Sequence, residues 1–214
     1  MARGRAPGYD SQRGHLLAVA AGLFARRGFA GTSMSEVGRA CGVSKPALYH
    51  YFRDKQQLVA EIAEAHVARL EALVGEVQAL GLAPEPHLRA LILRFVAEYA
   101  GAQDAHRVLT EDVRFLEPDA ERRVRAAQRR VVDAFASAVA ALRPDAAAAD
   151  LARPLAMLLF GMINWMFTWL KPKDGALTHA DMAPVVADLF FGGLPGVQLA
   201  SLRRPAHPPG AGRR

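Results

Sequence analysis

The spacing of apolar residues along the chain predicts helices almost throughout. Apolar residues recur every three or four positions, as in Leu58, Ile62 and Leu70, and no long stretch alternates between apolar and polar residues. The first pattern has the period of an amphipathic helix, whereas the second would indicate a strand. We therefore expect an all-α protein of about nine helices.

Capping residues, glycines and prolines divide this pattern into segments. Gly81 and Pro144 end helices, because glycine tolerates a left-handed backbone and proline cannot continue a helix. The longer helices are expected over residues 10–27, 55–80, 85–102, 105–116, 118–142, 146–170 and 178–191.

Two short helices joined by a tight turn are predicted within residues 28–55. Ser33 and Glu36 have the spacing of a capping box, Gly42 ends the first helix, and Ser44 is a good cap for the second. This is the layout of a helix-turn-helix, whose second helix enters the DNA major groove. An ordinary helical hairpin is the alternative, but the turn, the caps and the exposed basic and aromatic residues all favour DNA binding.

The same region resembles the DNA-binding domain of the TetR family of bacterial one-component repressors. The resemblance runs from about Ser11 to Leu58 and rests on the motifs Thr32-Ser33-Met34, Gly42-Val43-Ser44 and Ala47-Leu48-Tyr49-His50-Tyr51-Phe52. It implies that a set of residues in this region contacts operator DNA: Ser33, Ser35, Lys45, Pro46, Ala47, Tyr49, His50 and Lys55.

Within that set, the resemblance implies different contacts for different residues. It places Lys45, Pro46 and Ala47 near bases, and it places Lys55 on a phosphate. Many family members have a polar residue where this chain has Ala47. Because a methyl group reads only a thymine methyl or DNA shape, Lys45 is expected to carry more of the base readout.

Charge is distributed unevenly along the chain. Residues 1–60 contain 9 Lys and Arg against 3 Asp and Glu, whereas residues 61–200 contain 14 against 18. A basic head on a mildly acidic body suits a DNA-binding protein, because phosphate neutralisation supplies most non-specific affinity. Charge that serves only solvation is the alternative.

Other sequence features limit the class of protein. Cys41 is the only cysteine, which excludes an intramolecular disulfide framework and a cysteine-rich zinc site. The N-terminal residues have no apolar signal region, and the longest apolar run, residues 155–170, is short for a bilayer span. We expect a cytoplasmic protein with no membrane partner.

The sequence predicts four segments. They are a flexible basic arm (1–9), a helix-turn-helix DNA-binding domain (10–56), a ligand-binding and dimerisation domain (57–200) and a disordered tail (201–214). The last two predicted helices are apolar on more than one face, so they fit a four-helix interface with a second copy. The alternative is a thick monomer core, and the family resemblance favours a homodimer through these two helices.

No catalytic arrangement is present in the sequence. The seven histidines have no metal-binding spacing, and no glycine-rich phosphate loop follows a strand. We expect neither an enzyme, nor a metal site, nor a cofactor.

The middle of the chain instead has candidates for a ligand pocket. The aromatic and methionine candidates are Phe95, Tyr99, Phe115, Met162, Trp165 and Trp169, for which an ordinary core is the alternative. Arg122 and Arg129 belong to an arginine cluster that either forms a solvated face or holds an acidic ligand.

A second resemblance concerns the effector. The stretch from Gly161 to Leu194 resembles the C-terminal part of TetR-family regulators of fatty-acid, steroid-ring and phenylacetate breakdown. It implies an acyl- or aryl-CoA effector, with phenylacetyl-CoA as the first candidate. The expected function is therefore a repressor of a catabolic operon that its effector releases from a palindromic operator. A constitutive DNA-binding regulator without effector and a CoA-binding all-α module remain alternatives.

Overall fold

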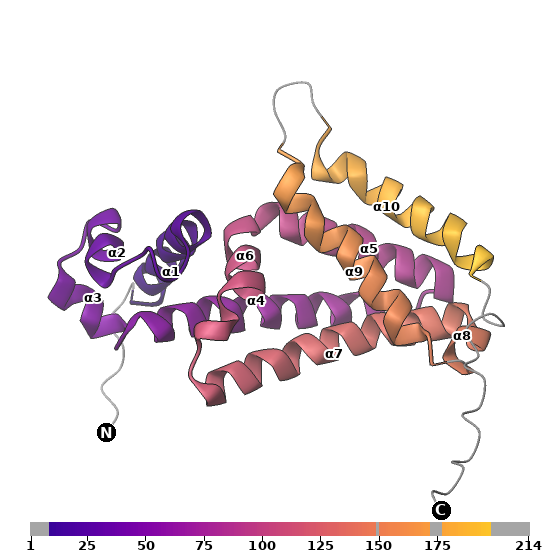
Figure 1. Ribbon diagram of the computed structural model, residues 1–214, viewed down its shortest axis with the longest axis horizontal. Coiled ribbons are helices and arrows are strands. Elements are labelled where there is room, and N and C mark those ends of the chain that lie inside the picture. The colour runs from indigo at the N-terminus through magenta and orange to yellow at the C-terminus, as the bar shows by residue number, and fades with distance from the viewer. Residues whose placement is uncertain (1–8, 149, 172–176, 198–214) are drawn as a thin grey trace, which may run out of the picture.

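A computed structural model describes residues 9–148, 150–171 and 177–197. These residues form ten α-helices and two short 3₁₀ helices without any strand, which confirms the predicted all-α class. Helices α1 (Tyr9–Arg27), α2 (Met34–Ala40) and α3 (Lys45–Tyr51) form a small head at one end of the molecule (Figure 1). The long helix α4 (Lys55–Gln78) leads from this head into the body.

The body is a bundle built around α4. Its remaining elements are α5 (Pro84–Gly101), α6 (Gln103–Glu111), η1 (Val113–Phe115), α7 (Pro118–Leu142), α8 (Pro144–Ala148), α9 (Ala152–Trp169), α10 (His179–Gly193) and η2 (Leu194–Gly196). Helix α7 packs along α4 and against α9, and α10 packs on α5 at the edge of the bundle (Figure 1). The short helix α6 packs against both α1 and α4, so it joins the body to the head.

Two predicted helices are wrong in their extent. The helix expected over residues 105–116 ends at Glu111 and is followed by η1. The expected helix over residues 146–170 is two helices, α8 and α9, separated by a break before Ala152. Asp150 adopts a left-handed backbone with φ 57°, a conformation that ends a helix and that a short polar side chain tolerates. The predicted arm and tail fall almost entirely outside the described residues.

A continuous apolar core runs through the head and the body. Phe24 and Phe52 are fully buried in the head, and Phe95 and Phe135 are fully buried in the body. No helix of the described residues is long and apolar enough to cross a membrane.

Candidate DNA interface and ligand cavity

The helix-turn-helix has the caps that the sequence predicts. The Glu36 N–H donates to Ser33 Oγ at 3.2 Å, and the Ser33 N–H donates to Glu36 Oε2 at 2.8 Å. Ser44 Oγ accepts from the Ala47 N–H at 3.3 Å, and Gly42 has φ 67° in the turn. The predicted capping box, second cap and glycine turn are therefore all confirmed.

Most residues predicted to contact DNA are exposed, although the Ser33 hydroxyl also donates to Glu36 Oε2 at 2.8 Å. Leu48 is fully buried, so it fixes which face of α3 turns inward. The other faces of α2 and α3 expose Ser33, Ser35, Lys45, Pro46, Ala47, Tyr49 and His50. The Lys45 ammonium lies 5.9 Å from the centre of the Tyr49 ring, so these two side chains lie together on α3.

Lys55 is the exception, and its geometry argues against the predicted phosphate contact. Its ammonium donates to the carbonyl oxygens of Phe29 at 2.6 Å and Thr32 at 2.9 Å, and it lies 4.0 Å from the centre of the Phe29 ring. Two of its three N–H groups are thus engaged inside the head. Lys55 fastens the loop between α1 and α2 to the start of α4.

The same loop is the junction between head and body. The Phe29 and Phe115 rings stack with centroids 4.9 Å apart and an interplanar angle of 13°. The Phe29 N–H donates to Asp112 Oδ1 at 3.4 Å, and Gln56 Nε2 donates to the Phe115 carbonyl at 3.0 Å. Burial raises the pKa of Asp112. Phe29 therefore lies between the ammonium of α4 and the aromatic ring of η1.

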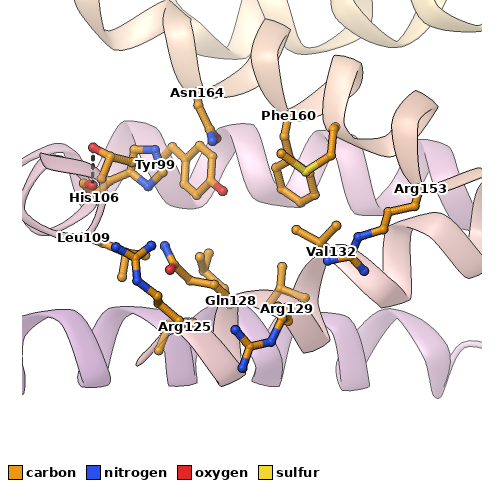
Figure 2. Close-up of a pocket in the computed structure, with 15 residues that line it drawn as sticks. Tyr99, His106, Leu109, Arg125, Gln128, Arg129, Val132, Arg153, Phe160 and Asn164 are labelled. Carbon is orange, nitrogen blue, oxygen red and sulfur yellow. Dashed lines mark hydrogen bonds between the residues drawn. The ribbon is translucent and has the colours of Figure 1, made fainter. Parts of the chain in front are cut away.

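A cavity of about 320 Å³ lies in the body, between α4, α5, α6, α7 and α9 (Figure 2). It is lined by Val67, Leu70, Tyr99, His106, Leu109, Thr110, Arg125, Gln128, Arg129, Val131, Val132, Arg153, Met157, Phe160 and Asn164. Of the residues predicted to bind ligand, the cavity wall includes Tyr99 and Arg129.

Most of the polar side chains lie at one end of the cavity, the polar end. Figure 2 shows His106, Tyr99, Asn164, Arg125 and Gln128 toward this end, together with Leu109, and it shows Phe160, Val132 and Arg153 toward the other end. The His106 ring stacks on Tyr99 with centroids 3.7 Å apart.

Two buried histidines, His66 and His106, lie next to each other at the polar end of the cavity. His106 Nδ1 lies 3.3 Å from His66 Nε2. Burial lowers the pKa of His106 to about 3 and that of His66 to about 4, so both rings are neutral at pH 7. His106 Nε2 and Asn164 Oδ1 are buried without a hydrogen-bond partner among the described residues.

The arginine cluster of α7 divides into two groups. Arg122, Arg123 and Arg130 are exposed and pair with Asp119, Glu64 and Glu71, as expected of a solvated face. Arg129 and Arg125, which also pairs with Glu121, line the cavity, and Arg125 lines an adjoining recess that contains Arg114. The two hollows share Leu109, Thr110, Arg125 and Gln128.

The other predicted ligand residues lie in three different places. Phe95 is fully buried and packs against Phe135, with ring centroids 4.8 Å apart. Phe115 belongs to the head–body junction. Met162, Trp165 and Trp169 line a groove of about 410 Å³ between α9 and α10, so they do not join Tyr99 at the cavity.

This groove is part of an apolar face. Trp165 is 66% exposed and Trp169 is 53% exposed, and further apolar side chains on the two helices are similarly exposed: Leu158, Val185 and Leu189. A contiguous apolar surface of this kind is typical of a protein–protein interface.

The sequence analysis did not assign several residues of the cavity wall to a ligand site: His106, Gln128, Arg153 and Asn164. Asn164 had the clearest sequence signal of these, because it is one of two polar residues, with Thr168, within the apolar run 155–170. His106 has no comparable signal in the sequence.

A helix-turn-helix head on an all-helical body with a cavity defines a class, the one-component transcriptional regulators. Residues 16–62 match the family described as bacterial regulatory proteins, tetR family, and residues 81–194 match the tetracyclin repressor-like C-terminal domain. The chain belongs to the TetR family and is a DNA-binding transcriptional regulator.

Individual relatives agree with this assignment. The chain is 27% identical over 191 residues to the transcriptional activator FasR of Mycolicibacterium smegmatis, covering 89% of this chain and 86% of FasR. A TetR-family regulator from Bordetella parapertussis 12822 is 33% identical, with a TM-score of 0.82 and coverage of 89% and 99%. AibR, solved in complex with isovaleryl coenzyme A and operator DNA, is 26% identical, with a TM-score of 0.72 and coverage of 83% and 97%. FasR and the Bordetella protein are both named as regulators of transcription.

Proposed function

We propose that this protein is a cytoplasmic homodimeric repressor that releases a palindromic operator when a small molecule fills the body cavity. The observation that carries the proposal is the continuity of α6 and η1. His106 and Leu109 of α6 line the cavity, and Phe115 of η1 stacks on Phe29 in the head. A ligand that shifts α6 would therefore move η1, and the stack of Phe115 on Phe29 would pass this movement to the DNA-binding head.

The proposed DNA contacts come from the seven exposed residues of α2 and α3. Ser33 and Ser35 approach phosphates, Lys45 and its two neighbours Pro46 and Ala47 approach bases, and Tyr49 and His50 contact phosphate or thymine methyl groups. Two heads on one face of DNA would read half-sites about 34–36 Å apart.

The proposed dimer forms through the apolar face of α9 and α10. Pairing this face with the same face of a second copy gives a four-helix interface around a two-fold axis. The exposed Trp165 and Leu189 would be covered by that interface. Aromatic side chains at the centre of an interface commonly supply much of its binding energy.

The proposed effector is an acyl- or aryl-CoA thioester. AibR, which has the same fold, was solved with isovaleryl coenzyme A. A cavity of about 320 Å³ has room for about ten water-sized groups at about 30 Å³ each, which suits an acyl group rather than a whole coenzyme. Arg125, Arg129 and Arg114, on the cavity and the adjoining recess, supply cations for the phosphates of the coenzyme.

Fluorescence anisotropy with a duplex of the protein's own promoter region tests the switch. Saturating thioester should weaken DNA binding by about 5- to 150-fold, which corresponds to a coupling of about 1–3 kcal/mol. Phenylacetyl-CoA is the first compound to test. If a panel of acyl- and aryl-CoA thioesters binds the protein but leaves DNA affinity unchanged, the proposed switch is wrong.

The variant Phe115→Leu tests the route from the cavity to the head. It keeps an apolar side chain but removes the ring stack with Phe29, so DNA and thioester should each bind as in the wild type while the coupling between them falls. Arg122→Ala is the control, because Arg122 is exposed and pairs only locally with Asp119. Unchanged coupling in Phe115→Leu would refute this route.

A further inference from the structure

The recess beside the cavity extends toward the junction between body and head. Its volume is about 510 Å³, and it adjoins the cavity at the four residues that the two hollows share. Two of these, Thr110 and Arg125, are exposed, so the boundary between the hollows lies at the protein surface. The rest of the recess wall comes from Glu111, Val113 and Arg114, at the end of α6 and in η1.

Arg114 is the one charge of the recess wall that has no ion pair among the described residues. The other charged side chains of that wall, Glu111 and Arg125, pair with neighbours on their own helices. In the described part of the body, every arginine except Arg114 and Arg129 pairs with a carboxylate. Arg129 lines the cavity, so each hollow has one arginine available to an anion.

Arg114 also touches the aromatic contact between body and head. Its guanidinium lies 4.8 Å from the centre of the Phe115 ring. Phe115 stacks on Phe29, whose ring centre lies 4.0 Å from the Lys55 ammonium. A series of contacts therefore leads from the recess, through two aromatic rings, to the start of α4.

We infer that Arg114 binds a phosphate of the effector, and that this contact is needed in addition to the filling of the cavity for DNA release. The inference rests on the proposed thioester effector and gives its phosphate end a role. The recess has room for about seventeen water-sized groups at about 30 Å³ each, which is close to the size of the pantetheine arm of coenzyme A. With the acyl group in the cavity, this arm would cross the exposed Arg125 and bring the phosphates to Arg114.

The energetics of arginine favour a change at Phe115 when a phosphate binds. A guanidinium makes two charge-assisted hydrogen bonds to a phosphate, which are stronger than an exposed contact between a cation and a ring. A phosphate in the recess would therefore draw Arg114 from the Phe115 ring. An acyl group alone would leave this contact in place, because Arg114 does not line the cavity.

Two thioesters that differ in a single phosphate test the inference. They are phenylacetyl-phosphopantetheine and phenylacetyl-pantetheine, titrated by calorimetry and then added at saturation to the fluorescence anisotropy assay. If phenylacetyl-CoA does not bind, both carry the acyl group of the tightest-binding CoA thioester of the panel. The phosphorylated thioester should weaken DNA binding by about 5- to 150-fold and the other by less than about twofold.

Equal effects of the two thioesters on DNA binding would overturn the inference. The response to the CoA thioester tests the proposed function separately, so the two failures can be distinguished. If no thioester of the panel binds, the proposed effector is wrong and the inference falls with it.

The variant Arg114→Gln assigns the response to this residue. Arg114 is exposed, so the variant should fold. It should bind the phosphorylated thioester about tenfold less tightly, since a hydrogen bond to a charged group is lost. Its coupling, the ratio of DNA affinities without and with saturating thioester, should fall close to one. Because this ratio is measured within one variant, a change in DNA affinity without ligand cancels.

Arg129→Gln is the matched control. It removes the other unpaired arginine, which lines the cavity and not the recess. Its coupling at saturation should stay at the wild-type value even if the thioester binds more weakly. Wild-type coupling in Arg114→Gln would refute the role of Arg114. Loss of coupling in both variants would also refute it, because any positive charge near the hollows would then suffice.

Discussion

Replacing Lys55 by methionine tests whether its ammonium holds the head together or contacts DNA. The change keeps much of the apolar stem but removes two charge-assisted hydrogen bonds, to Phe29 O and Thr32 O, and the contact with the Phe29 ring. Because the site is only partly buried, each hydrogen bond is assigned about 1 kcal/mol and the ring contact about 0.5–1 kcal/mol. The free energy of unfolding should therefore fall by about 2–3 kcal/mol.

The assay combines thermal unfolding with salt-dependent DNA binding. In a chain of this length the melting temperature should fall by about 5–10 °C. The slope of log affinity against log salt should stay at the wild-type value at a temperature where the variant is folded, because no phosphate contact is lost.

Lys45→Met is the matched control, for which we expect unchanged stability and weaker DNA binding. Lys45 is exposed on α3, so its loss should change stability by less than about 0.5 kcal/mol. Because Lys45 is the proposed base contact, its loss should weaken binding to the operator more than binding to unrelated DNA. A stable Lys55→Met protein with a reduced salt slope would refute the internal role of Lys55.

Three further predictions follow from other parts of the molecule. Burial lowers the folded-state pKa of His66 to about 4 and of His106 to about 3, below the unfolded value of about 6.5, so the folded protein binds fewer protons. Stability should fall as the pH drops through 6.5, by about 2 kcal/mol for each ring between pH 7 and pH 5, and urea unfolding of His106→Phe should show about half this loss. At Gly38 an added Cβ would lie 3.1 Å from the Val43 carbonyl, so Gly38→Ala should destabilise the head by about 1–2 kcal/mol; a melting temperature equal to wild type would count against this tight approach. Trp165→Asp should convert the proposed dimer to a monomer in analytical ultracentrifugation, and a dimer that persists would exclude the α9–α10 face.

The helix-turn-helix could be predicted from the sequence because its signals are local. Ser33, Glu36, Gly42 and Ser44 act on backbone groups within four residues, so their spacing alone specifies the caps and the turn. The exposure of the recognition residues followed from the same pattern, because the buried Leu48 orients α3.

Lys55 shows what the sequence could not supply in the head. A lysine at the first turn of a helix after a recognition helix is compatible with a phosphate contact. Its actual partners, the carbonyls of Phe29 and Thr32, are more than twenty residues away in the chain. Only the fold of the α1–α2 loop brings them to the ammonium.

The ligand site was less predictable, because it too depends on contacts between residues far apart in the chain. Trp165 and Trp169 form an apolar stripe, but a stripe does not say whether a ligand, a core or a second copy covers it. His106 and Asn164 belong to helices separated by about fifty residues, and their common cavity depends on how α6 and α9 pack across the bundle. Tyr99 was predicted as an aromatic candidate and Arg129 as part of the arginine cluster, whereas Phe95 and Arg122 on the same two helices do not line the cavity.

The position of Phe29 limits where the head of this regulator can be joined to the body of a relative. Its ring is held by Lys55 on one side and stacked on Phe115 on the other, so the boundary predicted between residues 56 and 57 cuts through a shared contact. A chimera that joins this head to another body at that boundary would bring a foreign side chain opposite Phe29. A chimera made to change operator preference should therefore keep its effector response only when the residue at position 115 is transferred together with the head.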